Sequence, residues 1–255
     1  MSQQSIKNSH IEYVQRLADS SLILGQRISE WCGHAPVLEE DIALANTALD
    51  YIGQARLLLS HVGELEGNGR DEDQLAFLRN EPAFRNLTIC ELPNHDFART
   101  ILRNFLFSGL QLLIWNALQR SSDAQLASIA EKSIKETRYH FNHSGEWVIR
   151  LGDGTNISHD KAQEALNYLW PYTNEFFAAT DIDVQVHDAG IGPAWVDLKG
   201  EWLNLISPVI SEACLTIPNE TPFSSFGKFG RHSEHLGHLL AEMQYLQRSY
   251  PGAQW

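Results

Sequence analysis

The stretch LEEDIALANTALDYIGQARLLLSHVGEL, residues 38–65, decides the fold class, because its apolar residues recur at intervals of three and four. These residues are Ile42, Ala45, Leu49, Ile52, Ala55, Leu59 and Val62. Such spacing places them on one stripe of an amphipathic helix, which would be roughly 40 Å long at 1.5 Å per residue. The stretch therefore predicts a long helix that packs its apolar stripe against other helices.

Three further long helices are predicted from helix start and stop signals. They span Ser9 to Trp31, Asp96 to Arg120, and Asp123 to Leu151. Ser9 with Glu12, and Ser122 with Gln125, have the spacing of capping boxes. Four long helices in sequence are typical of a helical bundle, and both a ferritin-like and a generic bundle fit the periodicity.

The remainder of the chain adds shorter helical segments. They span Ser158 to Phe177, Pro193 to Cys214, and Ser233 to Tyr250. Pro171 predicts a kink in the first of these segments and Pro208 a break in the second. Glu81 to Leu92 reads as a connection, and Asp181 to Val186 alternates like a short strand. Because no repeat or flexible linker is present, we predict a single, mostly α domain over residues 1–255, a four-helix bundle with additional C-terminal helices.

Composition excludes several classes of function. The 255 residues include 32 acidic and 19 basic side chains, a formal net charge of −13, so a nucleic-acid partner is not expected. The apolar run from Phe105 to Leu118 is interrupted by polar residues and is shorter than a membrane span, which predicts a buried helix and no membrane partner. The start of the chain lacks the pattern of a secretory signal. The three cysteines are an odd number and lie far apart in the sequence, so they predict no disulfide framework. The expected setting is the cytoplasm.

The residues on the inner faces of the predicted helices show whether the bundle could hold a metal centre. Helical di-iron proteins use a Glu from each of two helices and a Glu-x-x-His from each of the other two. In KETRYH, residues 135–140, His140 could be the histidine, but Thr137 stands three residues before it. In the helix predicted over residues 38–65, the equivalent positions hold Tyr51 and Gln54, and the segment from Asp96 to Arg120 has no acidic residue after its first position. Spacing alone therefore gives no complete ligand set.

Four motifs in order carry a resemblance to a known family. They are GQRISEWCGHAP at residues 25–36, IALANTALDYIGQAR at 42–56, KETRYH at 135–140 and EHLGHLLAEMQYLQR at 234–248. Together they resemble the C-subunit family of the phenylacetyl-CoA epoxidase complex, with a match from about residue 17 to Trp255. The resemblance implies a ferritin-like fold related to the catalytic A subunit, which carries the di-iron centre, and a non-catalytic role for the C-type subunit.

The resemblance also implies a degenerate metal site. Its six positions are Glu30, Tyr51, Gln54, a position near Ser108, Thr137 and His140. Only Glu30 and His140 keep a ligand type, and neutral hydrogen-bonding groups replace the others. Glu30 is either a buried carboxylate that needs a donor such as His140 or Tyr51, or a helix-end carboxylate facing water. We expect His140 to be a satisfied core or interface histidine.

The implied function is that of a structural, non-catalytic subunit that pairs with the homologous A-type subunit and the other epoxidase components acting on phenylacetyl-CoA. No cofactor is expected on this chain. The resemblance assigns di-iron to the partner, and NADPH, flavin and iron–sulfur to a separate reductase. If this chain touches CoA, the resemblance points to Phe84, Arg85, Asn86, Val184, Gln185 and Val186. The alternative is a self-sufficient di-metal oxidase using Glu30, Asp50, Glu136 and His140.

Two remaining patterns have both a structural and a functional interpretation. His232, His235 and His238 spread over about 120° of a helix at 100° per residue, so a structural role is favoured over a metal site. Trp195 and Trp202 share an apolar stripe and could be either core residues or anchors for a partner subunit.

Overall fold

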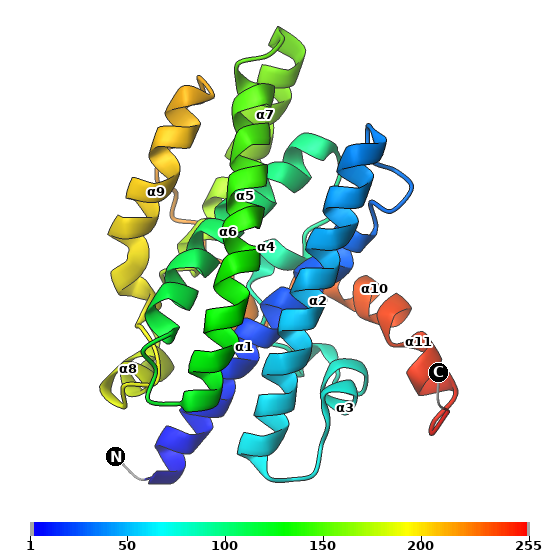
Figure 1. Cartoon of the computed structure of the whole chain (residues 1–255), viewed down its shortest axis with the longest axis vertical. Coiled ribbons are helices and arrows are strands. Elements are labelled where there is room, and N and C mark those ends of the chain that lie inside the picture. Colours follow the sequence, from blue (N-terminus) through cyan, green and yellow to red (C-terminus); the bar gives the residue numbers. More distant parts are fainter. Residues whose placement is uncertain (1–2, 254–255) are drawn as a thin grey trace. The chain divides into compact units, whose positions relative to one another are not determined.

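The computed structural model describes residues 3–253, which form an all-α fold with no β-strand among them. The predicted fold class is therefore confirmed. The four longest helices are α1 (Gln3–Ser29), α2 (Leu38–Glu66), α5 (Phe97–Leu118) and α6 (Ala124–Gly152), and they form an α1–α2 pair and an α5–α6 pair (Figure 1). The chain divides into two compact units, and each is described by itself; the predicted single domain stays a prediction.

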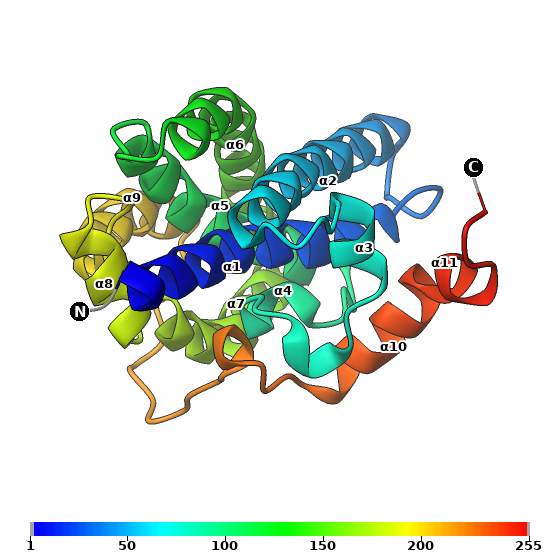
Figure 2. The ribbon, with the colours of Figure 1, turned by 90° about the horizontal axis from the view of Figure 1, so that it is seen from below.

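The first unit contains the chain up to Pro93 and from Ser225 onward. Its centre is an antiparallel pair of helices, α1 and α2, which lie side by side along their lengths (Figures 1 and 2). Its shorter elements are α3 (Glu72–Phe77), the 3-10 turn η1 (Glu81–Ala83), α4 (Thr88–Glu91), η4 (Gly227–Phe229), α10 (Glu234–Met243) and α11 (Tyr245–Ser249). Helix α10 packs against η1 and α4, which brings the end of the chain back to residues 81–91.

Gly25 explains how α1 and α2 approach closely. A Cβ atom at Gly25 would lie 3.0 Å from Ile52 Cγ1 and 3.2 Å from both the Ala48 carbonyl oxygen and Tyr51 Cβ. Real side chains rarely tolerate such contacts, so the absence of a side chain here lets the two backbones come together. Tyr51 is consequently held in the interior of this pair, with no exposed surface.

The second unit contains residues 94–224 and is built on the α5–α6 pair. Its other elements are α7 (Asn156–Leu169), η2 (Trp170–Glu175), α8 (Asp181–Asp188), η3 (Trp195–Leu198) and α9 (Lys199–Glu212). Both α7 and α9 pack against α5 and α6. Helix α5 is long and apolar enough to cross a membrane by length and composition, but 78% of its most apolar window is buried in the structure, as the core helix of a compact unit would be.

Two predicted capping boxes are wrong, although the helices they introduced exist. Helix α1 begins at Gln3, so Ser9 is a buried residue inside the helix. The Ser-x-x-Glu spacing also occurs within helices, and only an extended backbone at the serine would make it a cap. Helix α6 is capped by Asp123, whose carboxylate accepts a hydrogen bond from the Leu126 N–H, and the Ser122 hydroxyl donates to the Ala189 carbonyl oxygen instead.

Three further local predictions are corrected by the structure. The strand-like segment 181–186 is the start of α8, because the Thr180 hydroxyl caps the Asp183 N–H and acidic residues in the first turn favour a helix. The connection at residues 81–92 contains η1 and α4. Helix α9 continues through Pro208, where both the proline and Asn204 are exposed, so water can satisfy the Asn204 carbonyl that loses its partner. The predicted kink at Pro171 corresponds to the change from α7 to η2.

The apolar stripe predicted for α2 is only partly its core face. The residues that α2 buries in the core are Leu44, Ala48, Tyr51, Ala55, Leu58, Leu59 and Val62. Ile42 and Leu49, which the periodicity placed in the same stripe, are exposed. Helix α2 therefore has two apolar faces, and spacing alone merged them into one.

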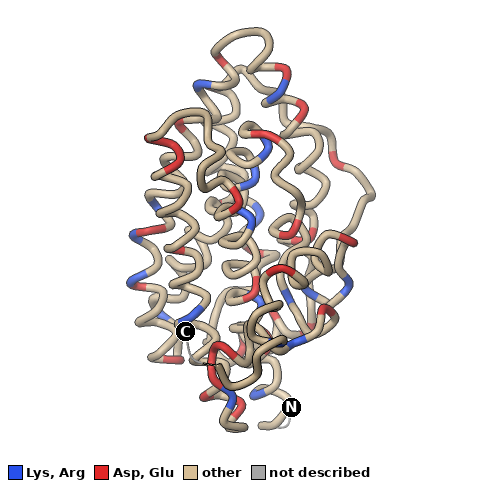
Figure 3. The backbone as a smooth tube through the Cα atoms, turned by 90° about the vertical axis from the view of Figure 1, so that its right-hand side faces the viewer, with Lys and Arg blue, Asp and Glu red and all other residues tan. Residues whose placement is uncertain are grey.

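Charged side chains are dispersed along both units. In Figure 3, acidic and basic positions are spread along the described backbone, and the acidic ones are more numerous. This distribution agrees with a solvated acidic surface and offers no basic stripe for a polyanion.

Candidate functional site

Four of the six positions implied by the family resemblance hold neutral side chains, and all four are buried. In the first unit, Tyr51 and Gln54 occupy the inner face of α2. In the second unit, Ser108 on α5 and Thr137 on α6 have no exposed surface. The Ser108 hydroxyl donates to the Phe105 carbonyl oxygen at 3.3 Å, within its own helix. These side chains behave as ordinary polar members of the helix cores.

His140 lies on the buried face of α6 together with Thr137, three residues away. Its backbone carbonyl accepts a hydrogen bond of 2.6 Å from the Ser144 hydroxyl, and its ring lies edge-on to Tyr139 with centroids 6.3 Å apart. No acidic residue precedes it at the spacing of a Glu-x-x-His motif. His140 is thus a buried histidine, and the pattern around it is not that of a di-iron ligand.

Glu30 corresponds to the exposed one of the two alternatives. Helix α1 ends at Ser29, and the Glu30 side chain, 41% exposed, accepts a hydrogen bond of 2.7 Å from the Arg27 guanidinium. Arg27 also donates to the Glu91 carbonyl oxygen at 2.9 Å, which holds the guanidinium at the end of the helix. A cation in the last turn of a helix is favourable, and it keeps Glu30 at the surface.

The donor set does not fit a di-iron centre. Iron and manganese sites in helical bundles need four carboxylates with two imidazoles, whereas Tyr51, Gln54, Ser108 and Thr137 supply none. The alternative set also falls short. Glu30 is exposed, Asp50 and Glu136 are only half-buried, and α5 carries no acidic residue at all.

The two candidate CoA-contact segments lie in different units and differ in exposure. Phe84 and Asn86 are fully buried, and the Asn86 amide donates to Glu91 Oε2 at 2.8 Å. The half-buried Arg85 donates to the Pro82 and Phe84 carbonyl oxygens at 2.7 and 2.8 Å. Its guanidinium is therefore already engaged by the protein.

The second segment, Val184 to Val186, is helical and divided between inside and outside. Val184 is exposed, Gln185 is half-buried and Val186 is buried, so at most two of the three could meet a ligand. The apparent strand alternation therefore did not define one face.

Sequence reasoning missed a network of buried charges in the first unit. Asp19 on α1 forms a bidentate ion pair with Arg79, one contact of which is 2.9 Å, and both side chains are buried. The Arg79 guanidinium also lies over the Phe84 ring, 4.2 Å from its centroid. Asp19 also accepts from the Arg85 N–H at 2.8 Å. No local signal links residues 60 positions apart, so only the fold could have shown this pair.

His232 is part of a second buried pair, with Glu91. Its Nδ1 lies 2.8 Å from Glu91 Oε2 and its Nε2 lies 3.1 Å from the Phe84 carbonyl oxygen. Because both neighbouring atoms are acceptors when Glu91 is ionised, the arrangement suits a doubly protonated ring. The Ser233 N–H donates to the other Glu91 oxygen at 2.6 Å. Residues 232–233 are thereby fixed to α4, immediately before α10.

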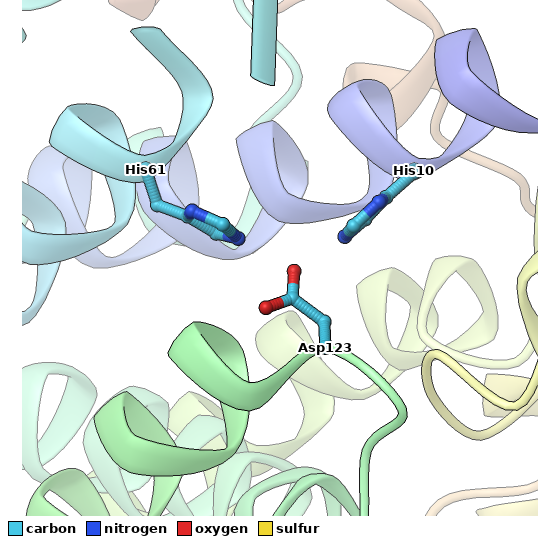
Figure 4. Close-up of side chains that lie close together, drawn as sticks. All are labelled: His10, His61 and Asp123. Atoms are coloured by element: carbon cyan, nitrogen blue, oxygen red, sulfur yellow. The ribbon is translucent and has the colours of Figure 1, made fainter. Parts of the chain in front are cut away.

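A pair of imidazoles lies between α1 and α2. The rings of His10 and His61 meet edge to face with centroids 6.0 Å apart, and Figure 4 shows them pointing toward one another. His61 Nδ1 also lies 3.6 Å from Glu64 Oε2. Asp123, drawn in the same figure, belongs to the second unit, where it caps α6. The pair by itself offers two ligands, fewer than the three or four protein ligands of a zinc site.

A cavity of about 510 Å³ lies in the first unit between α3 and the end of the chain. Its lining includes Asp71, Asp73, Phe77, Arg248 and Tyr250. Partial burial, together with the neighbouring charges of Glu72 and Asp71, raises the pKa of the Asp73 carboxyl. Arg248 is engaged by the Phe77 and Arg79 carbonyl oxygens. An acidic lining of this kind does not favour a phosphate-bearing ligand.

These features define an all-α, ferritin-like chain whose expected metal-ligand positions carry neutral side chains. The chain belongs to the family of phenylacetic acid catabolic proteins, whose sequence profile matches residues 1–255. It is similar to the C subunit of 1,2-phenylacetyl-CoA epoxidase from Escherichia coli (strain K12), with 48% identity over 248 residues, which are 97% of this chain and 100% of the relative. The family resemblance read from the four motifs is confirmed.

Proposed function

We propose that this chain is the non-catalytic, structural subunit of a 1,2-phenylacetyl-CoA epoxidase complex in phenylacetate degradation. The observation that carries the proposal is the 48% identity to the C-type subunit of the Escherichia coli epoxidase, which extends over the full length of that relative. Similarity of this extent covers both helix pairs and the C-terminal helices, so the whole chain, and not one module, supports the assignment.

The buried positions support the non-catalytic part of the proposal. Carboxylates buried without a metal would repel one another, and desolvation would cost several kcal/mol for each. Tyr51, Gln54, Ser108 and Thr137 avoid that cost, because burying a neutral polar group costs far less than burying a carboxylate. The interior of each unit is therefore suited to stability and not to oxygen chemistry.

The chemistry of the complex is assigned to other subunits. Di-iron belongs to the homologous A-type subunit, and NADPH, flavin and iron–sulfur cofactors belong to a separate reductase. This chain would stabilise its catalytic partner in the cytoplasm. Any contact it makes with CoA would come from Arg85, Val184 or Gln185, since Phe84, Asn86 and Val186 are buried.

Co-expression with the A-type subunit of the same organism tests the proposal. We expect the two chains to co-elute in size-exclusion chromatography, and this chain alone to show no epoxidation of phenylacetyl-CoA with the reductase. The A-type subunit purified without this chain is the matched control for partner stability. A chain that never co-elutes, or one that turns over phenylacetyl-CoA alone, would contradict the proposal.

A further inference from the structure

A cavity of about 210 Å³ lies in the second unit, between η2, the start of α9 and the irregular loop at residues 215–224. Aromatic side chains line it on the side of the core: Trp170, Phe177 and Trp202. The ring centroids of Trp170 and Phe177 lie 5.6 and 5.3 Å from that of Trp202. Trp195 and Trp202, the two tryptophans considered as interface anchors, are each 1% exposed and belong to the core.

The loop at residues 215–224 covers the cavity on its outer side. The Gln163 amide, on α7, bonds both the N–H and the carbonyl oxygen of Thr216, at 2.8 and 2.9 Å. Asn174, on η2, donates to two carbonyl oxygens later in the loop, at 3.1 and 2.9 Å. Between these fixed points, Ile217 and Pro218 line the cavity. A loop held at two points can move between them without a change in the helices, which gives a ligand a route into the cavity.

An ion pair lies at the edge of the cavity. Lys199 Nζ is 3.1 Å from Glu220 Oε1, and the two side chains are 47% and 85% exposed. Exposed pairs are weak, so a ligand carboxylate can replace Glu220 on Lys199 at little cost. Lys199 is also the first residue of α9, where the helix dipole favours an anion. The lining side chains Thr173 and Asn174 are already hydrogen-bonded to carbonyl oxygens of the protein. The cavity therefore combines an aromatic interior with one cation at its edge.

We propose that this cavity binds a small aromatic carboxylate, with the ring against the aromatic wall and the carboxylate on Lys199. The volume sets the size of the ligand. Because an apolar cavity of about 150 Å³ is enough for benzene, one of about 210 Å³ suits a single ring with a short side chain.

The lining also sets the chemical class of the ligand. Aromatic walls favour an aromatic ring through edge-to-face and offset contacts. A charge-assisted hydrogen bond from Lys199 favours the free acid over its thioester, which has no carboxylate near the ring. The inference stands on the cavity alone and does not depend on the proposed function.

Isothermal titration calorimetry of the full chain with phenylacetate tests the inference. Phenylacetate joins one ring to a carboxylate through one carbon, and for a ligand of this size we expect a Kd on the order of 0.1 mM. 2-Phenylethanol, which lacks the charge, should bind at least about tenfold more weakly. Cyclohexylacetate, which lacks the aromatic ring, should bind at least about threefold more weakly.

Two substitutions locate the site, with a matched control for the loss of a positive charge. Lys199→Met should weaken phenylacetate binding at least about tenfold, and Ile217→Trp, which fills the cavity from the loop, should abolish it. Lys132→Met, at an exposed position on α6, should leave the Kd unchanged. Phenylacetate should also slow hydrogen exchange in residues 215–224 of the wild type but not of Ile217→Trp. Far-UV circular dichroism and thermal unfolding verify that each variant is folded.

Three results would overturn the inference. The first is no saturable binding up to about 10 mM phenylacetate. The second is equal binding to the wild type, Lys199→Met and Ile217→Trp, which would mean that another surface takes the acid. The third is 2-phenylethanol binding as tightly as phenylacetate, which would contradict the role of the carboxylate. Because the assay contains this chain alone, these results leave the proposed subunit role to its own test.

Discussion

Helices α2 and α5 are both rich in apolar residues, yet their surroundings differ. Helix α5 is covered on every side along its central turns, where Phe105, Leu106 and Phe107 are consecutive and all buried. Helix α2 buries one face against α1 and leaves Ile42 and Leu49 in contact with solvent. A helix that is apolar all round normally lies in an interior. The difference teaches that the apolar pattern predicts which helix faces are apolar. Tertiary packing then determines which of those faces are buried within this chain.

The largest expected contrast comes from truncating one large side chain in each helix. Phe105→Ala should lower the free energy of unfolding by about 3–5 kcal/mol, because the ring is fully buried and stacks on Phe141 at 5.1 Å. Leu49→Ala should change it by less than about 0.5 kcal/mol, as expected for an exposed position. Urea unfolding of the isolated chain measures both values. Equal losses for the two variants would mean that α2 is covered within the monomer.

A pair of glycines provides a second contrast, with effects of opposite sign. Gly109 lies in α5, where an added Cβ would come within 3.2 Å of Phe141 and 3.3 Å of Ile206, so Gly109→Ala should cost about 1–3 kcal/mol through overpacking. Gly53 lies in α2 with open space around it, so Gly53→Ala should stabilise by about 0.5–1 kcal/mol through helix propensity. Thermal unfolding should show the two melting temperatures moving in opposite directions. A destabilising Gly53→Ala would contradict the open outer surface of α2.

These contrasts show how far the sequence alone could predict the fold. The long helices α2, α5 and α6 could be located within one or two residues from their apolar content and from the turn residues that flank them, although the caps Asp96 and Asp123 were found only in the structure. The two faces of α2 could not be separated, since Ile42 and Ala55 obey the same periodicity but face different surroundings. The strand predicted at 181–186 is wrong because six residues are too few to distinguish an alternating strand from a capped helix turn.

For the candidate site, the sequence predicted only which ligand types are missing. The lack of carboxylates at Tyr51, Gln54 and Thr137 was readable from spacing and resemblance. The exposure of Glu30 depends on where α1 ends, and the buried pair of Asp19 with Arg79 depends on tertiary contacts. No periodicity in the sequence indicates either of them.

The buried ion pair between Asp19, on α1, and Arg79 gives a contrast inside the first unit. Arg79→Ala should destabilise by about 3 kcal/mol, because it leaves the fully buried Asp19 carboxylate without its bidentate partner. Arg70→Ala, which breaks a pair between Glu66 and an Arg70 side chain that is 43% exposed, should cost less than about 1 kcal/mol. Denaturant unfolding of the two variants measures the difference. A similar small loss for both would show that Asp19 reaches water.

The smallest expected effect concerns Asp73 on α3, where burial and the neighbouring acids Glu72 and Asp71 raise the carboxyl pKa. A raised pKa means that the folded state binds the proton more tightly than the unfolded state, so this group's contribution favours folding at low pH and is lost as pH rises through the folded-state pKa. Asp73→Asn should therefore raise the melting temperature slightly at pH 7, by less than about 2 °C. At pH 3, below the ordinary pKa of aspartate and so also below the raised one, most of that difference should disappear. A larger gain at pH 3 than at pH 7 would contradict the direction of the shift.

The central claim is that this chain carries no functional metal centre and acts through its partner. Elemental analysis of iron and manganese on the chain, expressed and purified alone from metal-supplemented medium, tests it most directly. The A-type subunit measured in the same way is the positive control, and His140→Ala of this chain is the specificity control. We expect only trace metal on this chain, unchanged by His140→Ala. Near-stoichiometric metal that is lost in His140→Ala would contradict the claim and favour the di-metal oxidase.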